Sequence, residues 1–138
     1  MARKIGLDLG SKSLGIALSD PLNFTAQGKE NFRFEERDWD AAINKLKEYF
    51  DEYDIDVIVL GYVTYISGDK SETTYMIEEF REVLEKNFNV PIIYIDEKNT
   101  TNKAHEIMIG ANLSRKKRKK NKDKLAAQLI LEDYLMRI

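Results

Sequence analysis

Three carboxylate residues stand out because of where they fall in the pattern of apolar segments. Asp8 interrupts an otherwise apolar segment, Glu97 closes another, and Asp123 falls in a predicted C-terminal helix. A charge inside an apolar strand is costly unless it is paired or bound to a cation. Asp123 shares a helical stripe with Ala127 and Ile130, four and seven residues later, so we expect it to face a sheet and not solvent.

Each carboxylate also has a structural interpretation when it is taken alone. Asp8 could stand at the start of a hairpin, Glu97 could be a solvated loop acid, and Asp123 could be a helix-dipole residue, since Asp is favoured in a first turn. The three together favour a metal site, because oxygen ligands of this type suit Mg²⁺ or Mn²⁺. Two such ions about 3.5–4 Å apart can activate water and stabilise the leaving oxygen of a phosphodiester. The predicted chemistry is that of a nuclease.

The elements that must position these residues begin with a hairpin. Residues 4–9 and 14–18 alternate apolar and small or polar side chains, and a short polar link at residues 10–13 separates them. Residues 27–34 could supply a third, antiparallel edge strand after a turn at residues 20–21. The first part of the chain is therefore expected to form antiparallel strands.

The period of the pattern changes after the predicted hairpin. Apolar residues from Trp39 to Tyr53 recur at helical spacing, and a second helix carries an apolar face between Met76 and Phe88. Residues 57–61 and 91–95 are β-branched runs of the kind found in buried parallel strands. Reactive groups usually sit at the carboxyl ends of such strands, which is where Glu97 falls.

Two further helices complete the predicted chain. One begins at an N-cap in Thr100 or Thr101 and stops near Gly110, and the last runs from about residue 121 to residue 136. The order β-β-β-α-β-α-β-α-α predicts an α/β protein with a mixed five-stranded sheet flanked by helices. At 138 residues, with no internal repeat or linker, we expect one domain over residues 1–138.

The net charge of −2 conceals a basic segment ahead of the predicted last helix. Residues 114–124 hold eight basic residues and one acidic residue, which gives +7 and leaves −9 for the remainder. In most proteins a charge run is a solvated loop, but this one immediately precedes a candidate catalytic carboxylate and could grip phosphates. The candidate contacts within it are Arg115, Lys116, Lys117, Arg118 and Lys124. Lys12, in the hairpin link, is either a further phosphate contact or a turn lysine.

Composition excludes several other classes of site. The absence of Cys excludes a disulfide framework, a thiol nucleophile and cysteine-ligated metals, and a single His105 disfavours imidazole metal sites. The best apolar run, residues 57–63, is far shorter than the ~20 residues that cross a bilayer. With no signal-peptide pattern at the start, we expect a cytoplasmic protein with no membrane partner. Tyr62 and Tyr65 could stack on unpaired bases or simply anchor a loop.

Four segments carry a resemblance to a known family, in order along nearly the whole chain. They are residues 6–17 (GLDLGSKSLGIA), 19–21 (SDP), 96–101 (DEKNTT) and 123–131 (DKLAAQLIL). The set resembles the YqgF family, also called RuvX, whose members are described as pre-16S rRNA nucleases and, formerly, as Holliday junction resolvases. The resemblance implies a ribonuclease H-like fold.

The same resemblance implies a magnesium-dependent endonuclease that matures the 5′ end of 16S rRNA, with ribosomal precursor particles as possible partners. Asp8, Glu97 and Asp123 would hold the metal. The chain departs from the family pattern at Lys98, where an Arg is usual, so charge is kept but a bidentate phosphate fork is lost. Lys98 is still a candidate nucleic-acid contact. The loop at residues 62–68 also differs from the usual family sequence, which puts loop-based substrate selection in question.

Several alternative functions stay open at this point. A Holliday junction resolvase would use the same three carboxylates on four-way DNA junctions, and sequence does not separate it from an RNA endonuclease. A non-catalytic RNA-binding module is disfavoured because acids facing phosphates would serve no purpose in it. A phosphotransferase of the actin and sugar-kinase type would explain residues 8–13, but such enzymes close two lobes around ATP and need a longer chain. The oligomeric state is not indicated.

Overall fold

The computed structural model describes residues 2–64, 68–96 and 115–138, with side chains from residue 124 onward in the last of these segments. The chain starts with three strands, β1 (Arg3–Leu9), β2 (Ser13–Ser19) and β3 (Ala26–Arg33). Helices and strands then alternate in the order α1 (Trp39–Glu52), β4 (Ile55–Tyr62), α2 (Glu72–Asn87), β5 (Ile92–Asp96) and α4 (Arg115–Leu135). The predicted helix near residues 100–110 lies outside the described residues.

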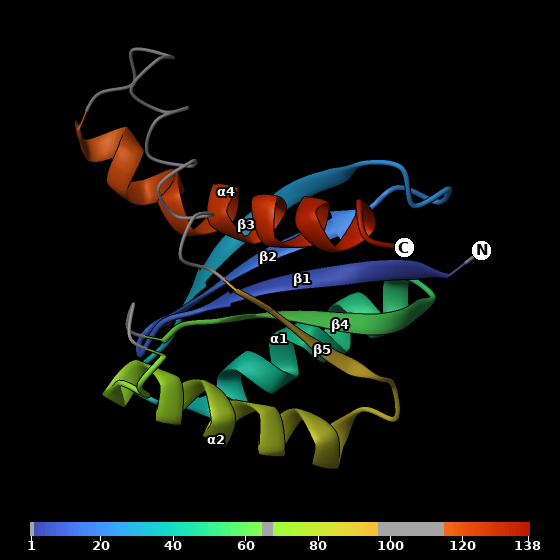
Figure 1. The fold of residues 1–138 in the computed structure, drawn as a ribbon. Coiled ribbons are helices and arrows are strands. Elements are labelled where there is room, and N and C mark those ends of the chain that lie inside the picture. Colours follow the sequence, from blue (N-terminus) through green and yellow to red (C-terminus); the bar gives the residue numbers. More distant parts are fainter. Residues whose placement is uncertain (1, 65–67, 97–114) are drawn as a thin grey trace.

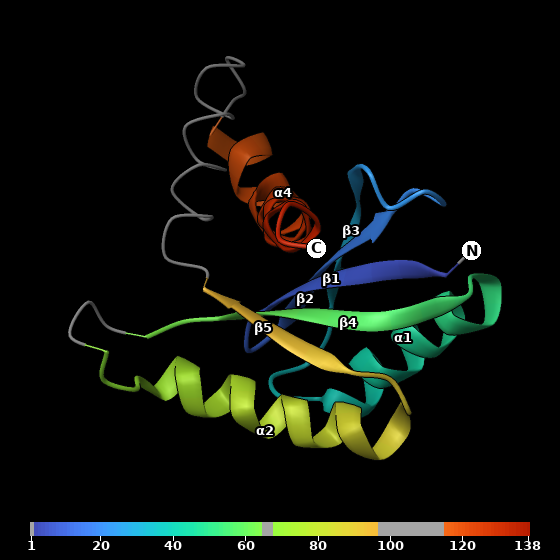
Figure 2. The same ribbon diagram turned by 45° about the vertical axis from the view of Figure 1, so that its right-hand side comes forward.

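The strands form one five-stranded sheet in the order β3-β2-β1-β4-β5. The first three strands pair antiparallel, and β1, β4 and β5 pair parallel, as the sequence predicted. The central strand β1 therefore joins the two halves of the sheet. Figure 1 shows the carboxyl ends of β1 and β4 on the side of the molecule where α4 begins, and Figure 2 shows the same arrangement.

Helices cover both faces of the sheet (Figures 1 and 2). One face carries Ile5, Leu7 and Leu9 of β1 against α1 and α2, within a large apolar core. The amphipathic stripe predicted for the first helix is confirmed, because its buried residues include Trp39, Ile43 and Leu46. Asp38 caps this helix, with its side chain accepting from the backbone nitrogen of Ala41 at 3.2 Å.

Helix α4 covers the other face with a smaller core. Ala127, Ile130 and Leu131 pack there against Val59 and Ile95 of the parallel strands, and against Ala17 and Ala26. The side chains of β1 alternate between faces, so Gly6 and Asp8 belong to the face that α4 covers. None of the described helices, α4 included, is both long and apolar enough to cross a membrane.

The start of the last helix differs from the prediction. Helix α4 includes residues from Arg115, whereas the sequence predicted a basic segment ahead of a helix beginning near residue 121. The prediction failed because a run of cationic residues shows no hydrophobic periodicity, which was the signal used to place helices. Asp123 therefore lies about two turns inside the helix and not in its first turn. The helix-dipole interpretation of Asp123 is lost with it, since that effect falls off within the first turn.

Candidate functional site

Asp8 is a buried carboxylate near the carboxyl end of the central strand. Its exposed fraction is 7%, and its backbone is paired with Gly15 of β2. Both neighbours in the chain, Leu7 and Leu9, point into the core on the opposite face. The structure thus confirms that β1 places this carboxylate inside the fold, on the face that α4 crosses.

Two glycines let α4 approach the sheet closely. A Cβ added to Gly6 would lie 2.7 Å from the Cβ of Leu131 and 3.0 Å from the backbone oxygen of Ala127. A Cβ added to Gly28 would lie 2.9 Å from the backbone oxygen of Lys124. Atoms that close would push the helix away, so glycine at both positions fixes where α4 crosses the strands.

A hydrogen bond ties α4 to the edge of the sheet. The backbone nitrogen of Gly28 donates to Oε1 of Gln128 at 3.0 Å, which satisfies a donor on edge strand β3. Gln128 belongs to the segment 123–131 that resembles the family, so one of those residues has a structural role. The contact also holds Lys124 beside β3.

Asp123 precedes Lys124 on this helix. Ala127 and Ile130, which follow Asp123 by four and seven residues, are fully buried against the sheet, as the predicted stripe requires. The side chain of Asp123 itself lies outside the described part of the chain. The backbone of α4 therefore carries Asp123 on the helix that covers Asp8's face.

Glu97 and Lys98 lie immediately beyond β5, outside the described residues. Strand β5 ends at Asp96, which pairs with Tyr62, and Ile95 packs on the α4 face of the sheet. Within the described ranges, no three His, Cys, Asp or Glu residues gather as metal ligands. The structure consequently places one member of the predicted carboxylate set and leaves the convergence of all three as a prediction.

The structure describes the side chains of some candidate phosphate contacts but not of others. Lys12 is exposed in the link between β1 and β2, where its backbone oxygen accepts from the nitrogen of Phe34 at 2.9 Å. The basic residues Arg115, Lys116, Lys117 and Arg118 belong to the first turns of α4, and their side chains are not described. Lys124 is half-buried and lines a cavity along β3.

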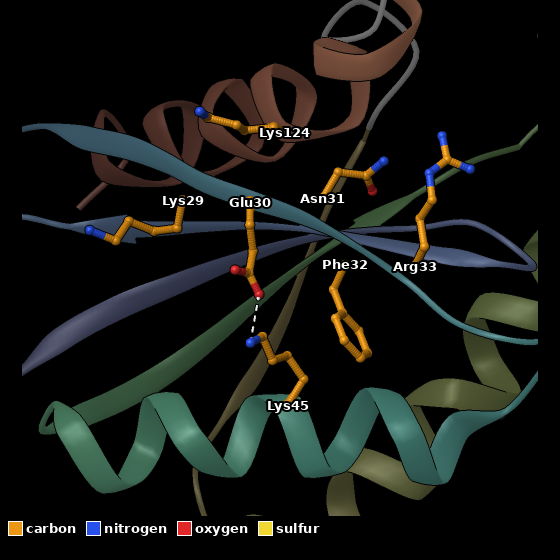
Figure 3. Close-up of a pocket in the computed structure, with 7 residues that line it drawn as sticks. All are labelled: Lys29, Glu30, Asn31, Phe32, Arg33, Lys45 and Lys124. Carbon is orange, nitrogen blue, oxygen red and sulfur yellow. Dashed lines mark ion pairs between the residues drawn. The ribbon is translucent and has the colours of Figure 1, made fainter.

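That cavity has a volume of about 520 Å³ and follows the outer strand of the sheet (Figure 3). Its lining comes from β3, from α1 and from α4, namely Lys29, Glu30, Asn31, Phe32, Arg33, Lys45 and Lys124. Except for Lys124, the sequence analysis did not single out these residues. A strand-edge cavity depends on strand order, which no local pattern in residues 26–33 reveals.

A second cavity, of about 490 Å³, lies where β1 ends. It is lined by residues of the β1–β2 link, of the segment before α1 and of the start of α2, namely Leu9, Gly10, Ser11, Glu36, Arg37, Glu72, Thr73 and Met76. Leu9 follows Asp8 directly, so this hollow lies beside the carboxyl end of the central strand. Leu9 and Met76 belong to the core under α1 and α2, so this hollow lies on the face of the sheet opposite to the side chain of Asp8.

The segment Ser19-Asp20-Pro21, part of the resemblance, builds a turn. The carboxylate of Asp20 accepts from the backbone nitrogens of Leu22, Phe24 and Thr25 at 3.0, 2.8 and 2.6 Å. These bonds, that from Thr25 first, hold the pKa of Asp20 below its usual value. Ser19 joins the turn to the start of β1 by accepting from the backbone nitrogen of Lys4 at 2.8 Å.

Tyr62 anchors its loop, which is the structural alternative that the sequence left open. Its ring packs on Tyr94 at 4.3 Å between centroids, and its hydroxyl donates to Oε2 of Glu78 at 3.2 Å. Burial, then the bond to Glu78, raises the pKa of Tyr62, while Lys70 at 2.9 Å lowers the pKa of Glu78. Tyr65 lies outside the described residues.

Comparison with known proteins gives matches over almost the whole chain. The family model described as "RuvX: Holliday junction resolvase" matches residues 2–137. A protein of Mycoplasmopsis pulmonis named "Putative pre-16S rRNA nuclease" is 46% identical over 134 residues, which cover 96% of this chain and 92% of that protein. A Bacillus subtilis protein of the same name is 44% identical over 133 residues, which cover 96% of each.

Solved structures agree on the architecture. The Fowlpox virus resolvase bound to Holliday junction DNA superposes with a TM-score of 0.58 at 17% identity, covering 98% of this chain and 97% of that one. RuvC of Thermus thermophilus, also with a Holliday junction substrate, gives a TM-score of 0.57 at 15% identity and covers 94% and 92%. At such identities the likeness shows the fold, which is ribonuclease H-like. The family match over residues 2–137 and the identities of 46% and 44% show that this chain belongs to the RuvX family.

Proposed function

We propose that this chain is a metal-dependent endonuclease that hydrolyses phosphodiester bonds, with the 5′ end of pre-16S rRNA as its substrate. The observation that carries the proposal is the buried carboxylate of Asp8 on the sheet face that α4 crosses. The names of the M. pulmonis and B. subtilis relatives support the choice of substrate. We take residues 1–138 as one domain acting in the cytoplasm, on free precursor rRNA or on ribosomal precursor particles.

The predicted donor set fits a hard divalent cation. Asp8, Glu97 and Asp123 would supply only carboxylate oxygens, which suit Mg²⁺ or Mn²⁺. Ile95 packs on the α4 face two residues before Glu97, and Ala127 packs there four residues after Asp123, which supports the convergence of the set. A bound ion would activate water and stabilise the charge on the leaving oxygen.

The chain's own residues would place the substrate. The basic residues at the start of α4 (Arg115, Lys116, Lys117 and Arg118) are carried by the same helix as Asp123, and Lys124 follows that acid directly. Cations along this helix would hold phosphates near the carboxylates, and Lys12 and Lys98 would extend the contact from neighbouring loops. Asp8 would be kept in place by the pairing of β1 with strands on both sides.

The experiment that tests the proposal is cleavage with Mg²⁺ or Mn²⁺ of a labelled panel by wild type and by Asp8→Asn. The panel holds single-stranded RNA with a 16S leader sequence, duplex DNA and a four-way junction. Removing a residue that only supports a metal ligand typically costs 10–100-fold, so losing a ligand should cost at least ~100-fold. Asp51→Asn, an exposed acid on α1, is the matched control and should keep full activity.

The outcomes separate the candidate functions. RNA cleavage that is lost in Asp8→Asn supports the proposal, whereas full activity in that variant removes Asp8 from the mechanism. Cleavage of the junction alone would establish a Holliday junction resolvase, which the description of the family model favours. Binding without any Asp8-dependent cleavage would leave an RNA-binding module.

A further inference from the structure

A row of three residues crosses the sheet from Asp8 to the outer strand. Asp8 pairs with Gly15 of β2, and Gly15 pairs with Asn31 of β3. Two interstrand spacings separate Asp8 from Asn31, which amounts to about 10 Å. Glycine in the middle means that β2 contributes no side chain between the acid and the amide. Asn31 is thus a polar neighbour of the candidate metal site within the length of a nucleotide or two.

Asn31 lies on the same face of the sheet as Asp8. Its chain neighbour Phe32 packs into the core shared with α1, so alternation turns Asn31 and Arg33 to the α4 face. Figure 3 shows these two side chains on one side of β3 and Phe32 on the other. Helix α4 contacts Gly28, which pairs with Ala17 in the neighbouring row of residues on this face. Asn31 therefore stands next to the place where α4 passes, one row nearer the carboxyl end of β1.

The side chain of Asn31 has a buried hydrogen-bond acceptor without a donor among the described residues. Its Oδ1 atom is buried and accepts no hydrogen bond within the part of the chain that the structure describes. A buried acceptor without a partner costs about 1–3 kcal/mol, so such atoms call for an explanation. The missing group must be a donor. Phosphate oxygens and DNA sugars along a backbone only accept, whereas the ribose 2′-hydroxyl of RNA donates.

The cavity that Asn31 lines is cationic. The chain outside residues 114–124, by contrast, has a net charge of −9. Lys29, Arg33, Lys45 and Lys124 line it, with Glu30 as its one acid. Lys45 Nζ lies 3.3 Å from Oε1 of Glu30, so the charges of these two residues compensate each other (Figure 3). Among described residues, Lys29 and Arg33 form no ion pair, so their charges are available to a polyanion. Lys124, next to Asp123 in the chain, connects this cavity with the candidate site.

We propose, on the basis of the proposed nuclease function, that Asn31 is a substrate-binding residue that recognises the ribose of RNA. Its amide oxygen accepts from a 2′-hydroxyl of the RNA strand held beside Asp8, and Lys29 and Arg33 bind the phosphates that follow along β3. The cavity is then the path of the substrate strand away from the cleaved bond. Within the sugar–phosphate backbone only RNA supplies such a donor, its 2′-hydroxyl, so Asn31 favours RNA over DNA.

The test is equilibrium binding in Asp8→Asn protein, with a single-stranded RNA oligonucleotide and its all-deoxy counterpart as probes. Adding Asn31→Ala should weaken RNA binding about tenfold, the value of one good hydrogen bond to a buried group, and should leave DNA binding unchanged. Lys29→Ala with Arg33→Ala should weaken both probes and lower the slope of log K against log salt by about 1.4 for two phosphates. Asn89→Ala and Lys86→Ala, exposed on the far side of the sheet, are the matched controls.

Stability separates this role from a structural one. Removing a buried acceptor that has no partner should leave the melting temperature of Asn31→Ala unchanged or raised, whereas a structural amide would lower it. Single 2′-deoxy substitutions along the RNA give a readout that needs no variant of Asn31. One position should account for most of the loss in affinity.

Equal effects of Asn31→Ala on RNA and DNA, or none on either, would overturn the inference even if cleavage depends on Asp8. If neither wild type nor Asp8→Asn cleaves RNA, the proposed function fails, while the binding comparison still decides the role of Asn31. If the protein binds neither probe, both proposals are wrong.

Discussion

At the scale of single residues, two aspartates of the resembling segments have different environments. Asp8 is buried on a strand between apolar neighbours, where a carboxylate serves no packing purpose. Asp20 lies at a turn and accepts three backbone hydrogen bonds. Local hydrogen bonds of this kind are the usual reason for Asp in a turn. The structure therefore gives Asp20 a structural role, and a catalytic role for Asp8 stays a prediction.

The bonds to Asp20 make part of the folding stability dependent on pH. Because its pKa is lowered in the folded state from a value of 3.8, its contribution is present above that value. The contribution is lost as the pH falls below 3.8 and through the folded pKa. Wild type should therefore be more stable than Asp20→Asn in urea unfolding at pH 7, with the difference narrowing towards pH 3. An unchanged difference across that range would show that the carboxylate charge has no part in the turn.

At the scale of elements, the first half of α4 opposes local preferences. Helix N-termini favour acids, yet the first turn of α4 contains none and is followed by successive cations. Like charges three and four residues apart also repel. A segment that breaks local rules without a structural gain is expected at a functional surface. Bound phosphates would relieve both penalties.

Neutralising the start of α4 should therefore affect stability and binding in opposite directions. With Arg115, Lys116, Lys117 and Arg118 all changed to Gln, the free energy of unfolding without RNA should rise by about 1 kcal/mol, at roughly 0.3 kcal/mol per cation. The salt slope of binding to single-stranded RNA should fall by about 3. Urea unfolding and a salt titration measure the two quantities. An unchanged slope would make the segment a solvated helix end, and Lys47→Gln with Lys86→Gln serves as the control.

At the scale of the whole molecule, two cores of different size share one sheet. The core under α1 and α2 contains Trp39, which packs on Phe34 and Phe80 at 6.0 and 5.3 Å between ring centroids. The core under α4 is smaller and rests on glycine and alanine contacts. Because both cores use strands β2, β4 and β5, loss of either should destabilise the other.

The chain should consequently unfold as one unit. Trp39 is the only tryptophan and is buried, so its fluorescence reports the larger core, while far-UV circular dichroism reports all helices. We expect the two signals to change together in urea, as in a two-state transition. A separate early loss of helix signal would mean that α4 unfolds independently and would contradict a single domain.

The sequence by itself determined most of the elements and one carboxylate of the candidate site. Apolar periodicity located the paired strands, the two amphipathic helices and the buried strands to within a few residues, because that pattern is what the packed faces require. It also singled out Asp8, since an acid in an apolar strand is visible in the sequence. The fold class followed from the order of these elements and from the resemblance.

Only the tertiary structure decided the relations between distant segments. The place of Asn31 opposite Gly15 and Asp8 depends on strand order and on a register shift between Ile16 and Ala17. The helical state of residues 115–120 could not be read from a run without apolar residues. The anchoring of Tyr62 at the end of β4 depends on its contacts with Tyr94 and Glu78. For Asn31 and Tyr62 the deciding interactions join residues far apart in the chain, whereas sequence patterns report what lies within a turn or a strand.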